Sequence, residues 1–142
     1  MALVSWTKKK LEYSRDKKDL RKMAEIRAAA ILTNTYVATD EVDVSGFSKV
    51  AIFFSVTKAS LTSFEYKVQQ SFDEGSTWYD ISAETVASAT ITDGIPIYQR
   101  TLAANEKWYK VILAVGERLR VQVQGTGTLT ACSCTVTVMG VY

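Results

Sequence analysis

After residue 34 apolar and polar residues alternate almost to the end of the chain, and this two-residue period limits the fold more than any other feature. The even positions of 50–56 are all apolar, and so are those of 64–68. Because side chains at i and i+2 lie on the same face of a β-strand, each segment predicts a strand with one buried face. The larger part of the chain is therefore expected to be built from strands.

Turn-forming residues divide this part of the chain into short strands. The segment 73–76, Asp-Glu-Gly-Ser, predicts a hairpin because Gly75 can take the positive φ that a tight turn requires. Pro96 lies in a predicted edge strand, where its missing N–H is tolerated. Short, evenly spaced strands without helices between them are typical of an antiparallel sandwich or barrel, and a jelly-roll-like β-sandwich fits best. The expected strands are 35–44, 50–56, 64–72, 77–82, 95–102, 108–115, 118–124 and 129–141.

The first 34 residues differ in charge from the rest of the chain. Nine basic and four acidic residues give 1–34 a local charge of +5, and because the whole chain carries +2, residues 35–142 carry −3. A basic arm joined to a mildly acidic body is the pattern of two differently built regions. We predict an N-terminal arm at 1–34 and a β-sandwich domain at 35–142.

The second half of the arm has the pattern of an α-helix. Leu20, Met23 and Ile31 recur at helical spacing, and no Gly or Pro interrupts them. A helix is therefore predicted over residues 16–32, with an apolar side that must dock on the body or on a neighbouring subunit. Residues 1–14 either continue this helix or stay extended.

The basic side chains of the arm are candidates for binding a partner. Three interpretations stay open: a solvated charged face, an electrostatic docking strip for an acidic protein surface, and sequence-blind contact with nucleic-acid phosphates. The last is the least favoured, because the chain holds no nucleic-acid motif. The candidate partner-binding residues are Trp6, Lys8, Lys9, Lys10, Lys17, Lys18, Arg21 and Lys22.

The lack of histidine excludes several classes of enzyme. The chain has no His, so the triads, Cys–His pairs and zinc motifs that depend on imidazole are missing. Nothing else supplies a nucleophile beside an activating base, and we expect neither enzymatic activity nor a cofactor. Cys132 and Cys134 would point to one face of a strand, too far apart for a relaxed disulfide. They are predicted to be reduced core thiols rather than metal ligands.

No apolar run approaches the length of a membrane span. The longest, 108–115, contains Lys110, whereas a span needs roughly 18 apolar residues. The apolar segment of a secretory signal is also missing, because Leu3 and Val4 are followed at once by a serine and soon by lysines. We expect a soluble protein without a membrane partner that is not exported by that route.

Neighbouring aromatic residues supply candidate contact sites on the sandwich. In each of the pairs Trp78-Tyr79 and Trp108-Tyr109 one ring should point inward and the other outward, because successive side chains of a strand alternate. Exposed rings of this kind stack on sugars or pack against partner proteins. The possible exposed aromatic patch comprises Phe53, Tyr79, Trp108 and Tyr142.

Two segments of the body resemble a known family. The stretch 42–47, VDVSGF, followed by 71–78, SFDEGSTW, is similar to the D-x-S-G-aromatic and S-x-D-x-G-[ST]-T-W pattern of small β-sandwich virion proteins from tailed bacteriophages. Residues 118–127 and the alternating final strand resemble the last two strands of those proteins. The likeness covers residues 42–142 and does not extend to the N-terminal arm.

The resemblance implies a non-enzymatic component of a phage particle, with a capsid decoration or cementing protein favoured over a neck or tail protein. It implies binding to viral capsid or other virion proteins as a homo-oligomer, a trimer being favoured, and a place in the virion after assembly in the host cytoplasm. An arm that reaches a neighbouring subunit would add its contacts to those of the oligomer. The alternative is a carbohydrate-binding β-sandwich module of a phage tail or bacterial surface protein, whose exposed rings stack on a glycan.

Overall fold

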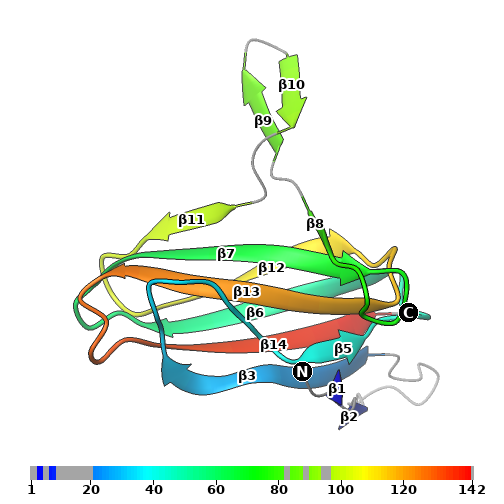
Figure 1. Cartoon of the computed structure of the whole chain (residues 1–142), viewed down its shortest axis with the longest axis horizontal. Coiled ribbons are helices and arrows are strands. Elements are labelled where there is room, and N and C mark those ends of the chain that lie inside the picture. The colour runs from blue at the N-terminus through cyan, green and yellow to red at the C-terminus, as the bar shows by residue number, and fades with distance from the viewer. Residues whose placement is uncertain are drawn as a thin grey trace, which may run out of the picture.

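Two β-sheets packed face to face form the body of the protein in the computed structural model (Figure 1). The structure describes residues 3–4, 7–8, 21–81, 84–87, 90–93 and 97–141, with side chains for 23–81 and 97–140. Sheet A follows the order β1-β5-β13-β7-β11, and sheet B the order β12-β6-β14-β3-β2. Neighbouring strands run antiparallel, except that β1 is parallel to β5.

Seven of the described strands belong to sheet A, five to sheet B and two to a separate hairpin. Sheet A comprises β1 (Leu3–Val4), β4 (Val37–Ala38), β5 (Glu41–Asp43), β7 (Leu61–Ser71), β8 (Tyr79–Asp80), β11 (Tyr98–Thr101) and β13 (Arg118–Gly127). Sheet B comprises β2 (Thr7–Lys8), β3 (Arg21–Ile31), β6 (Lys49–Thr57), β12 (Glu106–Leu113) and β14 (Ser133–Val141). The hairpin comprises β9 (Glu84–Ala87) and β10 (Thr90–Asp93), and it stands away from the body in Figure 1.

The core lies between the sheets, where the inward faces of the alternating strands meet. The even positions of β6 from Val50 to Val56 are buried, and so are the inward residues of β7. The rings of Phe54 and Phe64 meet edge to face across the core, with centroids 5.8 Å apart. Full burial of each large apolar side chain contributes about 1.5–3 kcal/mol. The predicted mainly β fold of two antiparallel sheets is thereby confirmed.

Residues 21–31 form strand β3, so the helix predicted over 16–32 is wrong for this part of the chain. β3 pairs antiparallel with β14 from end to end. Ala24 and Ile26 face the core, and Ile26 is 1% exposed. Pairing satisfies the backbone groups along one side of β14 and buries this apolar face, which together outweigh the helix propensity of the alanine run. Residues 16–20 lie outside the described part of the chain.

A bulge in β3 explains why its sequence looked helical. The register between β3 and β14 shifts on both sides of the pair formed by Arg27 and Val136. The Arg27 guanidinium lies at this irregularity and donates hydrogen bonds to the carbonyl oxygens of Cys134, Ala30 and Ile31. An extra residue in one strand moves the apolar positions out of a strict two-residue period. The segment therefore lost the alternation that identifies the other strands.

The hairpin turn predicted at 73–76 is confirmed by the antiparallel pairing of β7 with β8. The Asp73 carboxylate accepts hydrogen bonds from the Thr77 N–H at 2.7 Å and from the Ser71 hydroxyl at 2.8 Å. The bond from the Thr77 N–H is the main cause that lowers the pKa of Asp73. Gly75 has a φ of 90°, the left-handed conformation that the turn requires.

The C-terminal part of the chain agrees with its prediction except at one loop. Cys132 and Cys134 are buried in the core as free thiols, as expected. Residues 125–127, which fall between the predicted strands 118–124 and 129–141, instead belong to the end of β13, which pairs with β7 up to Gly127. A Cβ at Gly125 would lie 2.6 Å from a methyl carbon of Leu61, so glycine serves close packing there rather than a turn.

The hairpin of β9 and β10 falls between two predicted strands, in a segment for which no strand was expected. Its strands pair only with one another among the described residues. Pro96, predicted to lie in an edge strand, is outside the described residues. None of the described residues belongs to a helix able to cross a bilayer.

Candidate functional site

The outer face of sheet A is covered by polar side chains that contact one another. Glu65, on β7, accepts hydrogen bonds from the Tyr36 hydroxyl at 3.2 Å, from Gln124 at 2.6 Å and from Gln99 at 3.4 Å. Burial and, after it, the charge of Glu65 raise the pKa of Tyr36 to about 12. The Lys67 ammonium lies 4.5 Å from the centre of the Tyr36 ring. The middle of this face is therefore occupied by its own hydrogen-bonded groups.

A second polar group continues this layer toward β8. The Arg120 guanidinium donates to the Gln69 amide oxygen at 2.7 Å, and the Gln69 amide nitrogen donates to Asp80 at 2.6 Å. Arg120 also lies 4.3 Å from the centre of the Trp78 ring, covering one face of that ring. The Trp78 indole N–H donates to the Gly75 carbonyl at 3.1 Å. Because its polar groups are paired within the chain, this face offers little that a partner could satisfy.

The outer face of sheet B, unlike that of sheet A, carries a group of adjacent apolar side chains. The pairing register arranges its side chains in rows that cross adjacent strands. One row runs from β12 to β3 through apolar residues alone, and the rows beside it add Tyr109 next to Phe53 and Leu113 next to Lys49. We call the following residues the apolar stripe: Met23, Ala51, Phe53, Tyr109, Val111, Leu113 and Met139.

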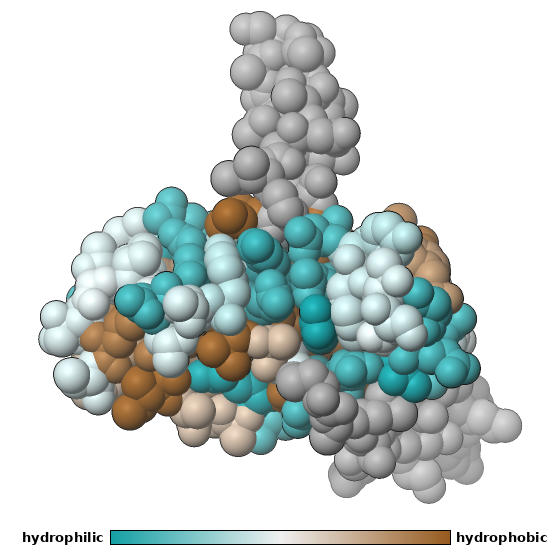
Figure 2. Space-filling model, in the orientation of Figure 1, coloured by the Kyte–Doolittle hydropathy of each residue, from teal (hydrophilic) through white to brown (hydrophobic). Residues whose placement is uncertain are grey.

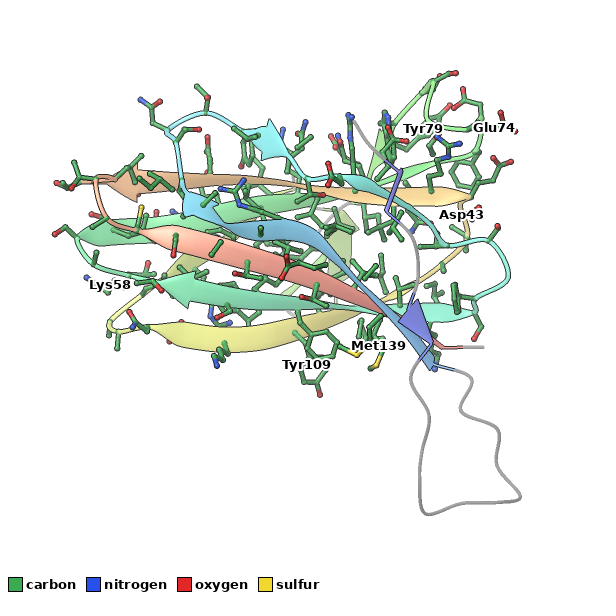
Figure 3. All side chains as sticks on the ribbon, turned by 90° about the horizontal axis from the view of Figure 1, so that it is seen from below. Asp43, Lys58, Glu74, Tyr79, Tyr109 and Met139 are labelled. Atoms are coloured by element: carbon green, nitrogen blue, oxygen red, sulfur yellow. The ribbon has the colours of Figure 1, made fainter. Side chains whose placement is uncertain are left out.

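The apolar stripe is open to solvent along β12. Tyr109 is 64% exposed, Val111 50% and Leu113 63%, and Val115, just beyond the strand, is 68% exposed. The rings of Tyr109 and Phe53 pack together with centroids 5.8 Å apart. Figure 3 labels Tyr109 and Met139, whose side chains project from this side of the sheet. Scattered exposed apolar residues are normal on a protein surface, but a contiguous group marks an interaction site.

Other exposed apolar residues lie elsewhere and do not join the stripe. In Figure 2 hydrophobic residues gather at the lower left of the body, where β3 ends in the orientation of Figure 1. Ile31, the last residue of β3, is 58% exposed. Phe72 and Tyr79 meet edge to face at 5.9 Å beside the β7–β8 turn. These groups are smaller than the set that follows β12.

A depression of about 310 Å³ lies on the outer face of sheet B, at the border of the stripe. Its floor and walls combine the rings of Phe53 and Tyr109 with polar groups from three strands. Rings beside hydroxyl and ammonium groups can hold a ligand that has both apolar and polar faces. The full lining comprises Phe53, Phe54, Ser55, Lys107, Trp108, Tyr109, Thr135 and Thr137.

The structure brings together only part of the predicted aromatic patch. Phe53 lies in the stripe, whereas Tyr79, 58% exposed, lies on β8 of sheet A. Trp108 does not belong to an exposed patch: it is partly buried and stacks on Phe54 with centroids 5.2 Å apart. Of the two neighbours on β12, Tyr109 takes the outward position, so one ring points in and the other out, as expected. Tyr142 lies outside the described residues.

The predicted arm residues lie mostly outside the described part of the chain. Lys8 is placed by its backbone in β2, and Arg21 and Lys22 are placed by their backbone in β3 rather than on a helix. Their role in binding a partner stays a prediction. Outside the described residues lie Trp6, Lys9, Lys10, Lys17 and Lys18.

Six of the seven stripe residues were missed as a site, although the sequence holds a signal for the three on β12. Tyr109, Val111 and Leu113 alternate with inward residues in a segment that is apolar at almost every position. A strand that is apolar on both faces, in a sandwich whose other strands alternate, buries one face in the core and leaves the other as an exposed apolar surface. Among the residues described, no three acidic, Cys or His side chains gather closely enough to hold a metal ion.

Comparisons with known proteins identify several solved structures of related fold but no family. No protein-family model matches the sequence, and no curated protein matches it. The SPBc2 prophage-derived protein YomS aligns with a TM-score of 0.50 and 21% identity, over 86% of this chain and 93% of that chain. At that identity the match shows a shared fold.

Two further solved structures are more remote. The enzymatically active domain of tailspike protein 4 from bacteriophage CBA120 aligns with a TM-score of 0.47 and 7% identity, over all 100% of this chain and 18% of that chain. A CBM4 structure aligns with a TM-score of 0.39 and 12% identity, over 87% of this chain and 69% of that chain. Likenesses this remote carry no inference about this chain.

Proposed function

We propose that the protein is a non-enzymatic structural component of a bacteriophage particle that binds other virion proteins through the apolar stripe. More specifically, we propose that it is a capsid decoration or cementing protein, located in the virion, whose N-terminal arm reaches a neighbouring subunit. The observation that carries it is the contrast between the two outer faces: sheet A pairs its own polar groups, whereas sheet B exposes Tyr109, Val111 and Leu113. A surface of the second kind is built to be covered by another protein.

The energetics favour burial of the stripe. The largest apolar patch on a typical monomer covers about 300–600 Å². If a partner covers about 300 Å² of the stripe, the transfer of this apolar surface from water contributes about 7.5 kcal/mol before the costs of association. Those costs are several kcal/mol, so a single stripe supports weak binding. Weak sites repeated in an oligomer or on a lattice combine by effective concentration. Weak binding at many repeated sites suits a protein that covers an assembled shell.

The chain shares its fold with a protein of phage origin. YomS is described as prophage-derived, and the alignment spans nearly the whole of both chains. This likeness supports the phage setting of the proposal and adds no residue to the site. The sequence resemblance to phage virion proteins at 42–47 and 71–78 points in the same direction.

The N-terminal arm has a smaller part in the proposal than the sequence suggested. Because β1 pairs in sheet A and both β2 and β3 pair in sheet B, the proposed contact with a neighbour is assigned to the residues of the arm outside these strands. Its basic residues are proposed to dock on an acidic surface of an adjoining virion protein. Phosphate contact remains the less favoured use of these lysines, and a steep loss of binding with salt would distinguish it.

Binding to particles tests the proposal. Particles of the phage whose genome encodes the chain, assembled without this protein, are mixed with purified wild type, sedimented and assayed for the bound protein. Val111→Asp places a charge in the middle of the stripe, and we expect at least about tenfold weaker binding, because the lost burial and the charge desolvation together exceed about 1.4 kcal/mol. Val37→Asp is the matched control, since Val37 is 40% exposed on β4 of sheet A.

The control separates the stripe from general surface effects. Both variants should fold, because both positions are exposed. If wild type does not sediment with any particle, the virion role is wrong. If Val111→Asp binds as tightly as Val37→Asp, the stripe is not the contact.

The depression beside the stripe favours a second candidate function, carbohydrate binding. Tyr109 and Phe53 can stack on the apolar face of a sugar, while Ser55, Thr135 and Lys107 can hydrogen bond to its hydroxyls. A volume of about 310 Å³ holds a small saccharide.

A glycan array followed by titration calorimetry tests this candidate. If a glycan binds and Tyr109→Ala abolishes the binding while Tyr79→Ala leaves it unchanged, the depression is a saccharide site. An array without hits removes the candidate. Tyr79 is the matched control because it is an exposed ring of similar exposure on the other sheet.

A further inference from the structure

Two lysines lie at the ends of the exposed apolar run on β12. Lys107 precedes Tyr109 by two residues on the outward side of β12, and Lys49, on β6, lies opposite Leu113 in the register. Both lysines are exposed. Neither has an ion-pair or hydrogen-bond partner among the described residues. The run from Tyr109 to Leu113 therefore has one free ammonium group at each end.

Strand geometry gives the spacing of these two charges. The row of Lys107 and the row of Lys49 are six residues apart along β12, because Lys49 lies opposite Leu113. Six residues span about 20 Å at about 3.4 Å each, and the two strands are neighbours about 4.8 Å apart. The Cα atoms of the two lysines are therefore about 21 Å apart, with the rows of Tyr109 and Val111 between them.

The one acidic residue among the described outward positions of β3, β6, β12 and β14 is Glu25, on β3. It lies opposite Thr137, in the row of Tyr109. By strand geometry its Cα is about 16–17 Å from those of Lys107 and Lys49. This separation is about twice the Debye length of about 8 Å at physiological ionic strength. Glu25 therefore leaves both lysines as positive charges for a partner.

We infer that the surface covering the apolar stripe belongs to a virion protein and is apolar in its middle and acidic at both ends, with carboxylate groups about 20 Å apart. This inference deepens the proposed function and rests on the stripe being the contact with the virion. A carboxylate opposite each lysine pairs with it, while apolar side chains of the partner cover those between the lysines. Opposite charges at the rim of an interface raise the association rate and fix the register of the two partners.

The other residues of this face favour a protein over a nucleic acid or a lipid surface. Phosphates pair with lysines but leave Val111 and Leu113 exposed to water, so the burial of apolar surface contributes nothing. Beside the run, the partly exposed hydroxyl groups of Ser55, Thr135 and Thr137 need hydrogen-bond partners when they are covered. A protein surface supplies such partners and hydrocarbon does not.

Particle binding of charge variants at two salt concentrations tests the inference. Particles assembled without this protein and emptied of DNA are mixed with the full-length variants Lys49→Gln, Lys107→Gln or both, sedimented and assayed for the bound protein. At about 0.05 M salt we expect each single variant to bind about threefold more weakly than wild type. The double variant should bind about ninefold more weakly, because sites this far apart act independently. At about 0.5 M salt the differences should fall below about 1.5-fold, because salt screens exposed charges.

The controls separate a local charge from net charge and from folding. Val37→Asp lowers the net charge by the same one unit on the other sheet, and it should bind within about 1.5-fold of wild type at both salt concentrations. Lys49→Arg and Lys107→Arg keep the positive charge and should bind as wild type does. Circular dichroism confirms that every variant folds.

Vesicles and DNA test the other occupants of the stripe. Vesicles of phosphatidylserine and phosphatidylcholine, and a short DNA duplex, are titrated with wild type and with Val111→Asp. We expect either no binding or binding that Val111→Asp leaves unchanged, because neither surface should cover the stripe. Binding to either that Val111→Asp abolishes would show that the stripe takes lipid or nucleic acid, and the inference would be wrong.

Each outcome of the particle assay decides the inference. If the glutamine variants bind as Val37→Asp does while Val111→Asp fails to bind, the stripe is the contact but its partner is not acidic, and the proposed function stands. Differences that persist undiminished at high salt also refute the inference, because the lysines then act through packing rather than charge. If wild type binds no particle, the proposed function is wrong and the inference falls with it.

Discussion

The assignment of residues 21–31 to a strand of sheet B can be tested by removing one side chain. Ile26 is 1% exposed and packs in the core, so Ile26→Ala deletes a fully buried group. The lost methyl and methylene groups account for about 2.4 kcal/mol at about 0.8 kcal/mol each, and the cavity adds to this. We expect a loss of about 3 kcal/mol in the free energy of unfolding, or about 10 °C in Tm.

The matched control is the same substitution five residues later on the same strand. Ile31 is 58% exposed, so Ile31→Ala should cost less than about 1 kcal/mol. Both variants are compared with wild type by urea denaturation at constant protein concentration, which keeps any self-association equal. If Ile26→Ala costs no more than Ile31→Ala, residues 21–31 do not contribute to the core and the strand assignment is wrong.

Three further predictions follow from the fold. A chain lacking residues 1–20 should give a cooperative thermal transition, whereas one lacking 1–32 should not fold, because it loses β3 and its core residues; circular dichroism distinguishes the two. Replacing residues 84–93 with a short Gly-Ser linker should leave Tm within about 2 °C, since β9 and β10 pair only with one another among the described residues, and a large drop would contradict this. Burial raises the pKa of the Cys134 thiol to about 12, so this thiol ionises at lower pH in the unfolded chain than in the folded one. The free energy of unfolding should therefore fall as pH rises from about 8.5 toward 12. At pH 8 the buried thiol should resist a thiol reagent until denaturant is added.

The strands of the body could be predicted because each carries its own signal. In β14 the inward residues from Cys134 to Val138 are apolar and the outward ones from Ser133 to Thr137 carry hydroxyl groups, so the period alone marks both the strand and its buried face. The turn at 73–76 needed only Asp73 and Gly75, whose roles are local. Features of this kind depend on neighbours in the sequence.

β3 could not be predicted in the same way. Its bulge at Arg27 breaks the period, and the alanine run beside it favours a helix when considered alone. What makes it a strand is β14, which lies more than 100 residues later in the chain and offers a complete row of backbone partners. Contacts between segments that far apart override local propensity.

The candidate site could also be predicted only in part from the sequence. The sequence predicted that one ring of the pair Trp108-Tyr109 would face outward, and the choice of Trp108 for the exposed patch was wrong, since strand alternation leaves that choice to the core. Packing of Trp108 on Phe54 made the choice. The stripe needs residues of four strands in one register, and a shift of one position would turn them to the other face.

The sequence by itself determined a mainly β chain with alternating buried faces, a defined turn and two core cysteines, because each depends on residues close together along the chain. Only the tertiary structure decided that residues 21–31 join sheet B, that one outer face satisfies its own polar groups, and that the other leaves an apolar stripe. The reason is physical: burial and backbone pairing are properties of neighbours in space, and the pairing register between distant strands selects those neighbours.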